Sequence, residues 1–63
     1  MNIESAKVMI LREWMSRPAD KRKESDASIF SIEHAHPEAP YQFRCSGDKY
    51  QRIMGWISNY IVS

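Results

Sequence analysis

Residues 46–62 carry apolar side chains at helical spacing, and this stretch limits the possible folds of the chain most strongly. Read as a helix, it gathers its apolar side chains on one stripe and its polar ones opposite. Ser46 is placed to cap the helix, and Asp48 puts negative charge at the positive end of the helix dipole. Gly55 falls on the polar face, at a cost of up to about 1 kcal/mol relative to alanine. The stripe consists of Tyr50, Ile53, Met54, Ile57, Tyr60 and Ile61.

Residues 2–17 predict a first helix that can cover this stripe. Asn2 is its expected cap, and Pro18 ends it because proline pushes the preceding residue out of helical dihedrals. Its core-facing residues, at spacings of three and four, are Ile3, Ala6, Ile10 and Trp14. Three further side chains widen the apolar arc beyond what one neighbouring helix covers, which indicates a second contact surface. They are Val8, Leu11 and Met15.

The middle of the chain favours a β-hairpin. Residues 18–28 are polar and charged and are interpreted as a linker. Residues 30–34 and 41–45 alternate apolar with polar side chains, as half-buried strands do, and the prolines between them allow a turn. The expected fold is therefore a mainly helical α+β domain of order α-β-β-α, in which the hairpin packs on the two terminal helices because two strands are not stable alone.

An all-α three-helix domain is the alternative. It extends residues 19–35 into a middle helix, supported by the good helix formers from residue 19 to residue 24. The β-branched and aromatic cluster at residues 29–32 argues against it. Either fold makes residues 1–63 a single small domain.

Size and composition narrow the class of protein. A chain of 63 residues buries only about 60% of its unfolded surface, so association with another chain is an expected aid to stability. Cys45 is the only cysteine, which excludes an internal disulfide and fits a reducing compartment. The net charge is +1. No signal peptide and no apolar run of about 20 residues is apparent, so we expect a cytoplasmic protein without a membrane span.

The residue types of metal and catalytic sites are present but poorly patterned. Glu33, His34, His36 and Cys45 include ligand types that zinc accepts, yet one cysteine and one His-x-His fall short of a paired four-ligand set. Cys45 with either histidine is the only candidate nucleophile and base, and so short a chain has little material for a substrate cleft. The sequence therefore predicts no metal, no cofactor and no enzyme.

A binding protein is the remaining class. Large apolar side chains exceed what two helices and a hairpin can bury, and Trp, Tyr and Met are favoured at interface centres. The predicted protein interface consists of Leu11, Trp14, Met15, Trp56, Tyr60 and Val62. It would serve a homodimer or a different protein.

The alternative function is weak DNA binding by a transcriptional regulator. Its candidate residues are Lys21, Arg22, Lys23 and Arg52. Clustered positive charge suits phosphates, but acidic residues flank the run, which disfavours nucleic acid as the partner.

The whole chain, from MNIESAKVMILREWMSRPADKRK to YQRIMGWISNYIVS, resembles the sixty-three-residue early open-reading-frame products encoded between the exonuclease and excisionase genes of bacteriophage lambda and other lambdoid phages. The resemblance is of overall sequence and brings no catalytic or binding motif. It implies a small early protein in the bacterial host cytoplasm. Such a protein would modulate phage development, namely the choice of lysis or lysogeny, prophage induction or host takeover. The resemblance does not imply its molecular partner. Taken with the predicted interface, it leads us to expect a host or phage regulatory protein.

Overall fold

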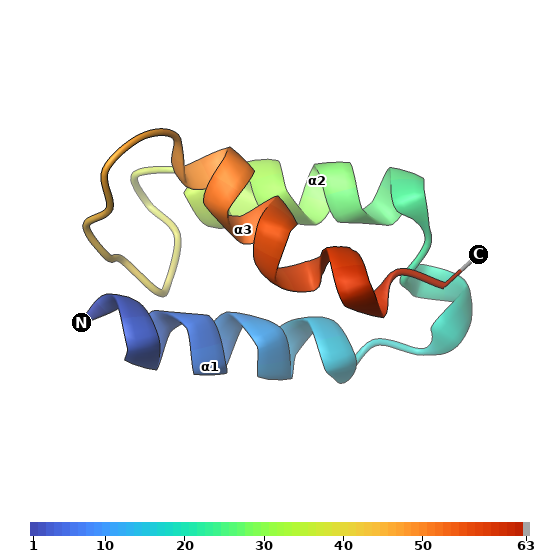
Figure 1. Cartoon of the computed structure of the whole chain (residues 1–63). Helices are drawn as coiled ribbons and strands as arrows, with labels where there is room; N and C mark the ends of the chain where they lie inside the picture. The colour runs from blue at the N-terminus through green and yellow to red at the C-terminus, as the bar shows by residue number, and fades with distance from the viewer. Residues whose placement is uncertain (63) are drawn as a thin grey trace.

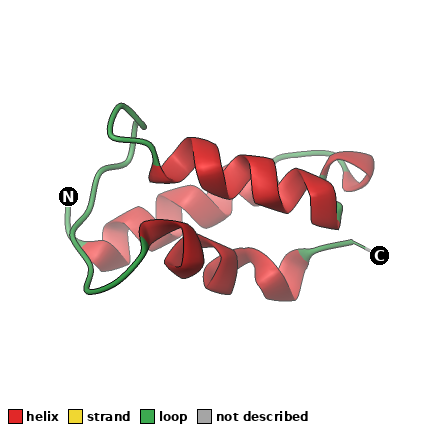
Figure 2. Cartoon of the chain, turned by 90° about the horizontal axis from the view of Figure 1, so that it is seen from above, coloured by secondary structure: helices red, strands yellow, loops and turns green. Residues whose placement is uncertain are grey.

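Three helices make up the computed structural model, which describes residues 1–62. They are α1 (Ile3–Met15), α2 (Glu24–Ala35) and α3 (Lys49–Ile57), with short 3-10 turns η1 (Ala19–Lys21) and η2 (Ser58–Tyr60). Helix α3 packs on both α2 and α1. The helices run along the length of the molecule, and the loops gather at its two ends (Figures 1 and 2).

The predicted β-hairpin is wrong. Residues 30–34 lie inside α2, residues 41–45 lie in an irregular loop, and no strand occurs within residues 1–62. The α-β-β-α arrangement is therefore replaced by the all-α alternative. The alternation over five residues misled the prediction, because Phe30 is buried in the core of the protein while Ile32 is exposed on the outer side of the same helix.

Helix α2 also replaces part of the predicted linker. It begins at Glu24, where Asp26 Oδ2 accepts a hydrogen bond of 3.1 Å from the amide of Lys23. Acidic residues in this first turn favour the positive end of the helix dipole. The β-branched residues later in α2 lower its intrinsic propensity by less than about 1 kcal/mol each, and burial of Ala27 and Phe30 offsets that cost.

Helix α1 confirms the predicted cap and the predicted buried stripe. Asn2 Oδ1 accepts a hydrogen bond of 2.8 Å from the amide of Ser5. The helix ends at Met15, two residues earlier than predicted, with Ser16 as its C-cap. Of the predicted stripe, Ile3 is partly buried, and the fully buried members are Ala6, Ile10 and Trp14.

Helix α3 is shorter than the predicted helix 46–62. Ser46 is not its cap: Asp48 Oδ1 accepts a hydrogen bond of 2.8 Å from the amide of Tyr50, so the helix begins at Lys49. After Ile57 the backbone tightens into η2. Of the predicted stripe, Ile53 and Ile57 are buried and Tyr60 is 46% exposed, while the partly buried members are Tyr50, Met54 and Ile61.

The core lies where the three helices meet, and one residue of the loop before α3 completes it. The rings of Trp14 and Phe30 pack edge to face with centroids 5.1 Å apart. Phe43, from the loop, packs on Trp56 of α3 at 5.2 Å. The buried core consists of Ala6, Ile10, Trp14, Ala27, Phe30, Phe43, Ile53 and Ile57.

Replacing the two glycines by alanine is expected to change the free energy of unfolding in opposite directions. Gly55 is exposed inside α3, and an added Cβ would meet no atom within 4 Å. We expect Gly55→Ala to raise the free energy of unfolding by about 0.5–1 kcal/mol, because alanine loses less backbone entropy in a helix. Gly47 has a φ of 87°, where a Cβ costs about 1–2 kcal/mol, so Gly47→Ala should destabilise. Urea unfolding of both variants tests this, and a destabilised Gly55→Ala would contradict the packing described for α3.

Candidate functional site

The candidate metal and catalytic residues do not converge. His34 Nδ1 lies 2.9 Å from the carbonyl oxygen of Phe30, and its ring stacks on the Phe30 ring at 3.9 Å. His36 Nδ1 accepts a hydrogen bond from the amide of Glu38. The Cys45 thiol lies against the carbonyl oxygen of Gly47. Within residues 1–62, no three His, Cys, Asp or Glu side chains are grouped to share a metal ion.

The candidate DNA-binding residues do not form one cluster either. Lys21 belongs to η1, and the next two residues connect η1 to α2 at one end of the molecule, whereas Arg52 lies on α3 (Figures 1 and 2). The guanidinium of Arg22 donates to the sulfur of Met15 at 3.6 Å. Arg22 therefore packs against its own chain.

Three of the predicted interface residues, Met15, Tyr60 and Val62, lie at the same end of the molecule. The carbonyl oxygen of Arg22 accepts a hydrogen bond of 2.8 Å from the amide of Val62, which brings the C-terminal segment beside Met15. Met15 and Tyr60 are each 46% exposed. Leu11 is partly buried.

The two tryptophans of the predicted interface contribute to the core instead of to an open surface. Trp14 is fully buried, and its Nε1–H donates a hydrogen bond of 3.1 Å to the carbonyl oxygen of Tyr60. It fastens the C-terminal segment onto α1 and presents no surface to a partner. Trp56 is partly buried beside Phe43. The interface prediction consequently loses its largest side chain.

Sequence reasoning missed the most exposed pair of isoleucines. Ile29 and Ile32 lie one turn apart on the outer side of α2 and are 57% and 60% exposed. Beside them is a hollow of about 350 Å³ between α2 and the following loop. The hollow is lined by Ile32, Glu33, His36, Glu38, Ala39 and Pro40. We call Ile29, Ile32 and this hollow the α2 outer face; a helical reading of residues 24–35 would have revealed it.

One polar contact ties the loop before α3 to α1. The Tyr41 hydroxyl donates a hydrogen bond of 3.1 Å to Glu13 Oε1. This bond favours the protonated phenol, so it raises the pKa of Tyr41 above its ordinary value, with partial desolvation and the negative charge of Glu13 adding to the shift. The contact holds the loop in place from the outside.

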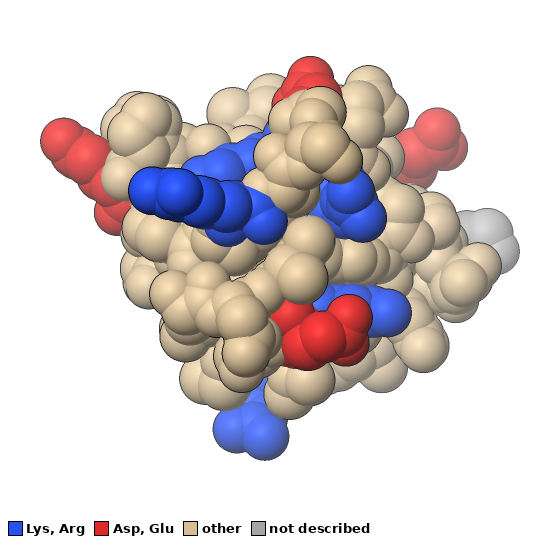
Figure 3. Space-filling model, turned by 60° about the vertical axis from the view of Figure 1, so that its left-hand side comes forward, with Lys and Arg blue, Asp and Glu red and all other residues tan. Residues whose placement is uncertain are grey.

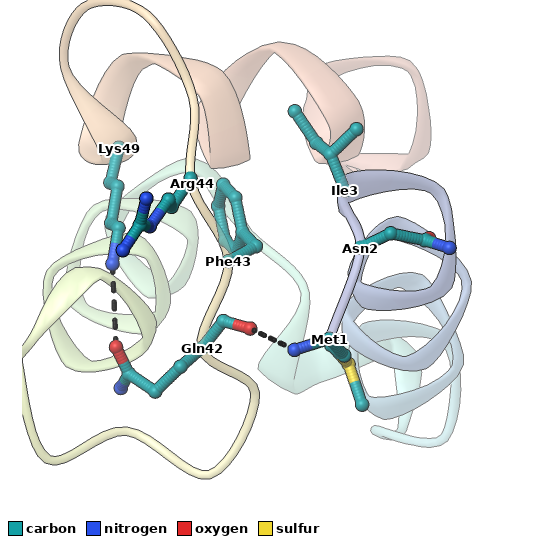
Figure 4. A pocket seen from close by; sticks show the side chains of 7 residues that line it. All are labelled: Met1, Asn2, Ile3, Gln42, Phe43, Arg44 and Lys49. Atoms are coloured by element: carbon teal, nitrogen blue, oxygen red, sulfur yellow. Dashed lines mark hydrogen bonds between the residues drawn. The ribbon is translucent and has the colours of Figure 1, made fainter.

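A hollow of about 680 Å³ lies where the start of α1, the loop and the first turn of α3 meet, and we call it the N-terminal cleft. Figure 4 shows its lining residues: Met1, Asn2, Ile3, Gln42, Phe43, Arg44 and Lys49. The terminal amine of Met1 donates to the carbonyl oxygen of Gln42 at 3.3 Å. Figure 3 shows this end of the molecule, with several Lys and Arg side chains across its middle.

Comparisons of the chain with protein-family models, with curated proteins and with solved structures gave no match. Among the described residues, every helix is too short or too polar to cross a lipid bilayer.

Proposed function

We propose that this chain is a non-enzymatic binding protein that docks on a host or phage regulatory protein through the α2 outer face. The observation that carries the proposal is the exposure of Ile29 and Ile32 beside an apolar hollow. Fully burying an isoleucine side chain is worth about 1.5–3 kcal/mol, so a surface that leaves two of them in water gains most when a partner covers it.

The charges around this face favour a basic partner. Glu33 and Glu38 line the hollow, and helix α2, which carries Glu24 and Asp26 in its first turn, contains no Lys or Arg. Acidic residues at the rim of an apolar surface attract a segment with the opposite charge and direct its approach. The partner that fits is therefore an amphipathic helix with apolar residues on one side and flanking Lys or Arg residues.

The resemblance to lambdoid early proteins supplies the biological setting. A small early protein that modulates phage development without chemistry of its own acts by binding. The proposed role is thus to change the choice of lysis or lysogeny, prophage induction or host takeover by occupying a regulatory protein. The proposal includes no cofactor and no catalytic step.

Paired double variants test which surface binds. A tagged chain with Ile29→Ser and Ile32→Ser should lose the protein that the unaltered chain captures from phage-infected bacteria, while its helical circular dichroism stays unchanged because both side chains are exposed. The matched control is Met15→Ser with Tyr60→Ser, which removes exposed apolar surface from the interface that was predicted from the sequence. We expect the control to retain capture.

Three results would contradict the proposal. The first is equal capture by the Ile29 and Ile32 double variant, and the second is loss of capture only in the Met15 and Tyr60 double variant. The third comes from sedimentation of the purified protein: a dimer that the isoleucine substitutions convert to a monomer would show that the α2 outer face binds a second copy of the chain.

A further inference from the structure

Gln42 fixes the position of a positive charge in the N-terminal cleft. Its Nε2 donates to the carbonyl oxygens of Ala39 at 2.7 Å and His36 at 3.2 Å, which determines the orientation of the amide. Its Oε1 consequently faces Lys49 and accepts a hydrogen bond of 3.3 Å from Nζ. The same Nζ lies 5.3 Å from the centre of the Phe43 ring, within the range of a cation–π contact. Neutral groups therefore hold the ammonium, and its charge is not cancelled.

Arg44 brings a second positive charge to the same side of the cleft. It follows Gln42 by two residues in the loop, is exposed, and lies next to the Lys49 and Gln42 side chains in Figure 4. None of the described residues lining the cleft is acidic. Two like charges on one wall repel each other, and an anion placed between them would relieve that repulsion.

We infer that the N-terminal cleft binds a phosphate-type dianion. The planar guanidinium of Arg44 can hold two phosphate oxygens side by side, and Lys49 can contact a third as a point charge. With the terminal ammonium of Met1, which also lines the cleft, the cations are sufficient for the two charges of a phosphate monoester, whereas a carboxylate brings only one. A hollow of about 680 Å³ is in the range of about 300–1,000 Å³ that small ligands occupy, so the phosphate can belong to a molecule of nucleotide size.

Amide chemical-shift titrations of the full chain test this inference. The probes are inorganic phosphate and adenosine monophosphate, at low salt and at a pH well above about 6, where a phosphate monoester is dianionic. We expect saturable shifts that are largest for the amides of residues 42–49. The double variant Arg44→Gln and Lys49→Gln should bind about tenfold more weakly or worse. The control, Lys21→Gln with Lys23→Gln, removes the same net charge at the other end and should bind like the unaltered chain.

The remaining measurements distinguish free phosphate from a nucleotide, and phosphate from other anions. Equal affinity for the two probes supports free phosphate as the ligand, and tighter binding of adenosine monophosphate supports a nucleotide. Acetate that binds as tightly as phosphate would overturn the inference. So would equal weakening in both double variants, since that result indicates general charge attraction. The α2 outer face is not involved, and loss of protein capture there leaves this test unaffected.

Discussion

Replacing Trp14 by alanine is expected to leave most of the chain unfolded at 25 °C. Truncating a buried aromatic side chain costs about 3–5 kcal/mol. In a chain of 63 residues, a single hydrophobic core rarely supplies more than about 3–5 kcal/mol of stability, so a loss of this size is about as large as the whole. Trp14 contributes on two counts, because its ring packs on Phe30 and its Nε1–H holds the carbonyl oxygen of Tyr60. Circular dichroism and amide chemical-shift dispersion measure the loss.

Trp14→Phe separates these two contributions. It keeps an aromatic ring in the core but removes the donor to Tyr60, so it should remain folded while the amides of the C-terminal segment exchange with solvent faster. A Trp14→Ala variant that unfolds with the same urea midpoint as the unaltered chain would show that this side chain is not in the core. That outcome would restore Trp14 as an interface residue.

Phe43→Ala is expected to lower the free energy of unfolding by about 3 kcal/mol, although the residue lies in a loop. Only 4% of Phe43 is exposed, and its ring lies 5.2 Å from that of Trp56. Removing it leaves a cavity between the loop and α3 and removes the aromatic face beneath Lys49. Urea unfolding, followed by circular dichroism at the helical bands, gives the size of the effect.

The neighbouring residue provides the control for this loop. Arg44→Ala truncates an exposed side chain of the same segment and should change stability by no more than about 0.5 kcal/mol. If Phe43→Ala and Arg44→Ala were equally mild, the loop would not be packed on α3. The N-terminal cleft would then have no fixed wall.

The sequence predicted α1 better than any other element, for local reasons. Its cap, its stripe and its end before Pro18 all depend on residues within one helix, and Asn2 and the buried stripe are where they were expected. Residues 24–35 were predicted as a helix only in the alternative, because Phe30, Ile32 and His34 alternate with polar residues as in a strand, although Ile32 is exposed on the helix. Tertiary burial of Ala27 and Phe30 decided the outcome, and no local pattern reports it.

The candidate sites show the same limit. Composition indicates that large apolar side chains must be buried, but it does not say which of them the fold buries. Trp14 was assigned both to the core-facing stripe and to the interface, and it is fully buried. The N-terminal cleft joins residues about forty positions apart, through the contact between Met1 and Gln42. No spacing rule within a single element could have predicted that contact.

The central claim is that residues 24–35 form a helix whose inner side closes the core and whose outer side presents Ile29 and Ile32. Backbone ¹³Cα chemical shifts of the purified chain test it most directly. Helical shifts continuous over residues 24–35, with none over residues 41–45, are the predicted result. Strand-like shifts over residues 30–34 and 41–45 would contradict it. They would indicate a β-hairpin, which would bury the surface on which the proposed function depends.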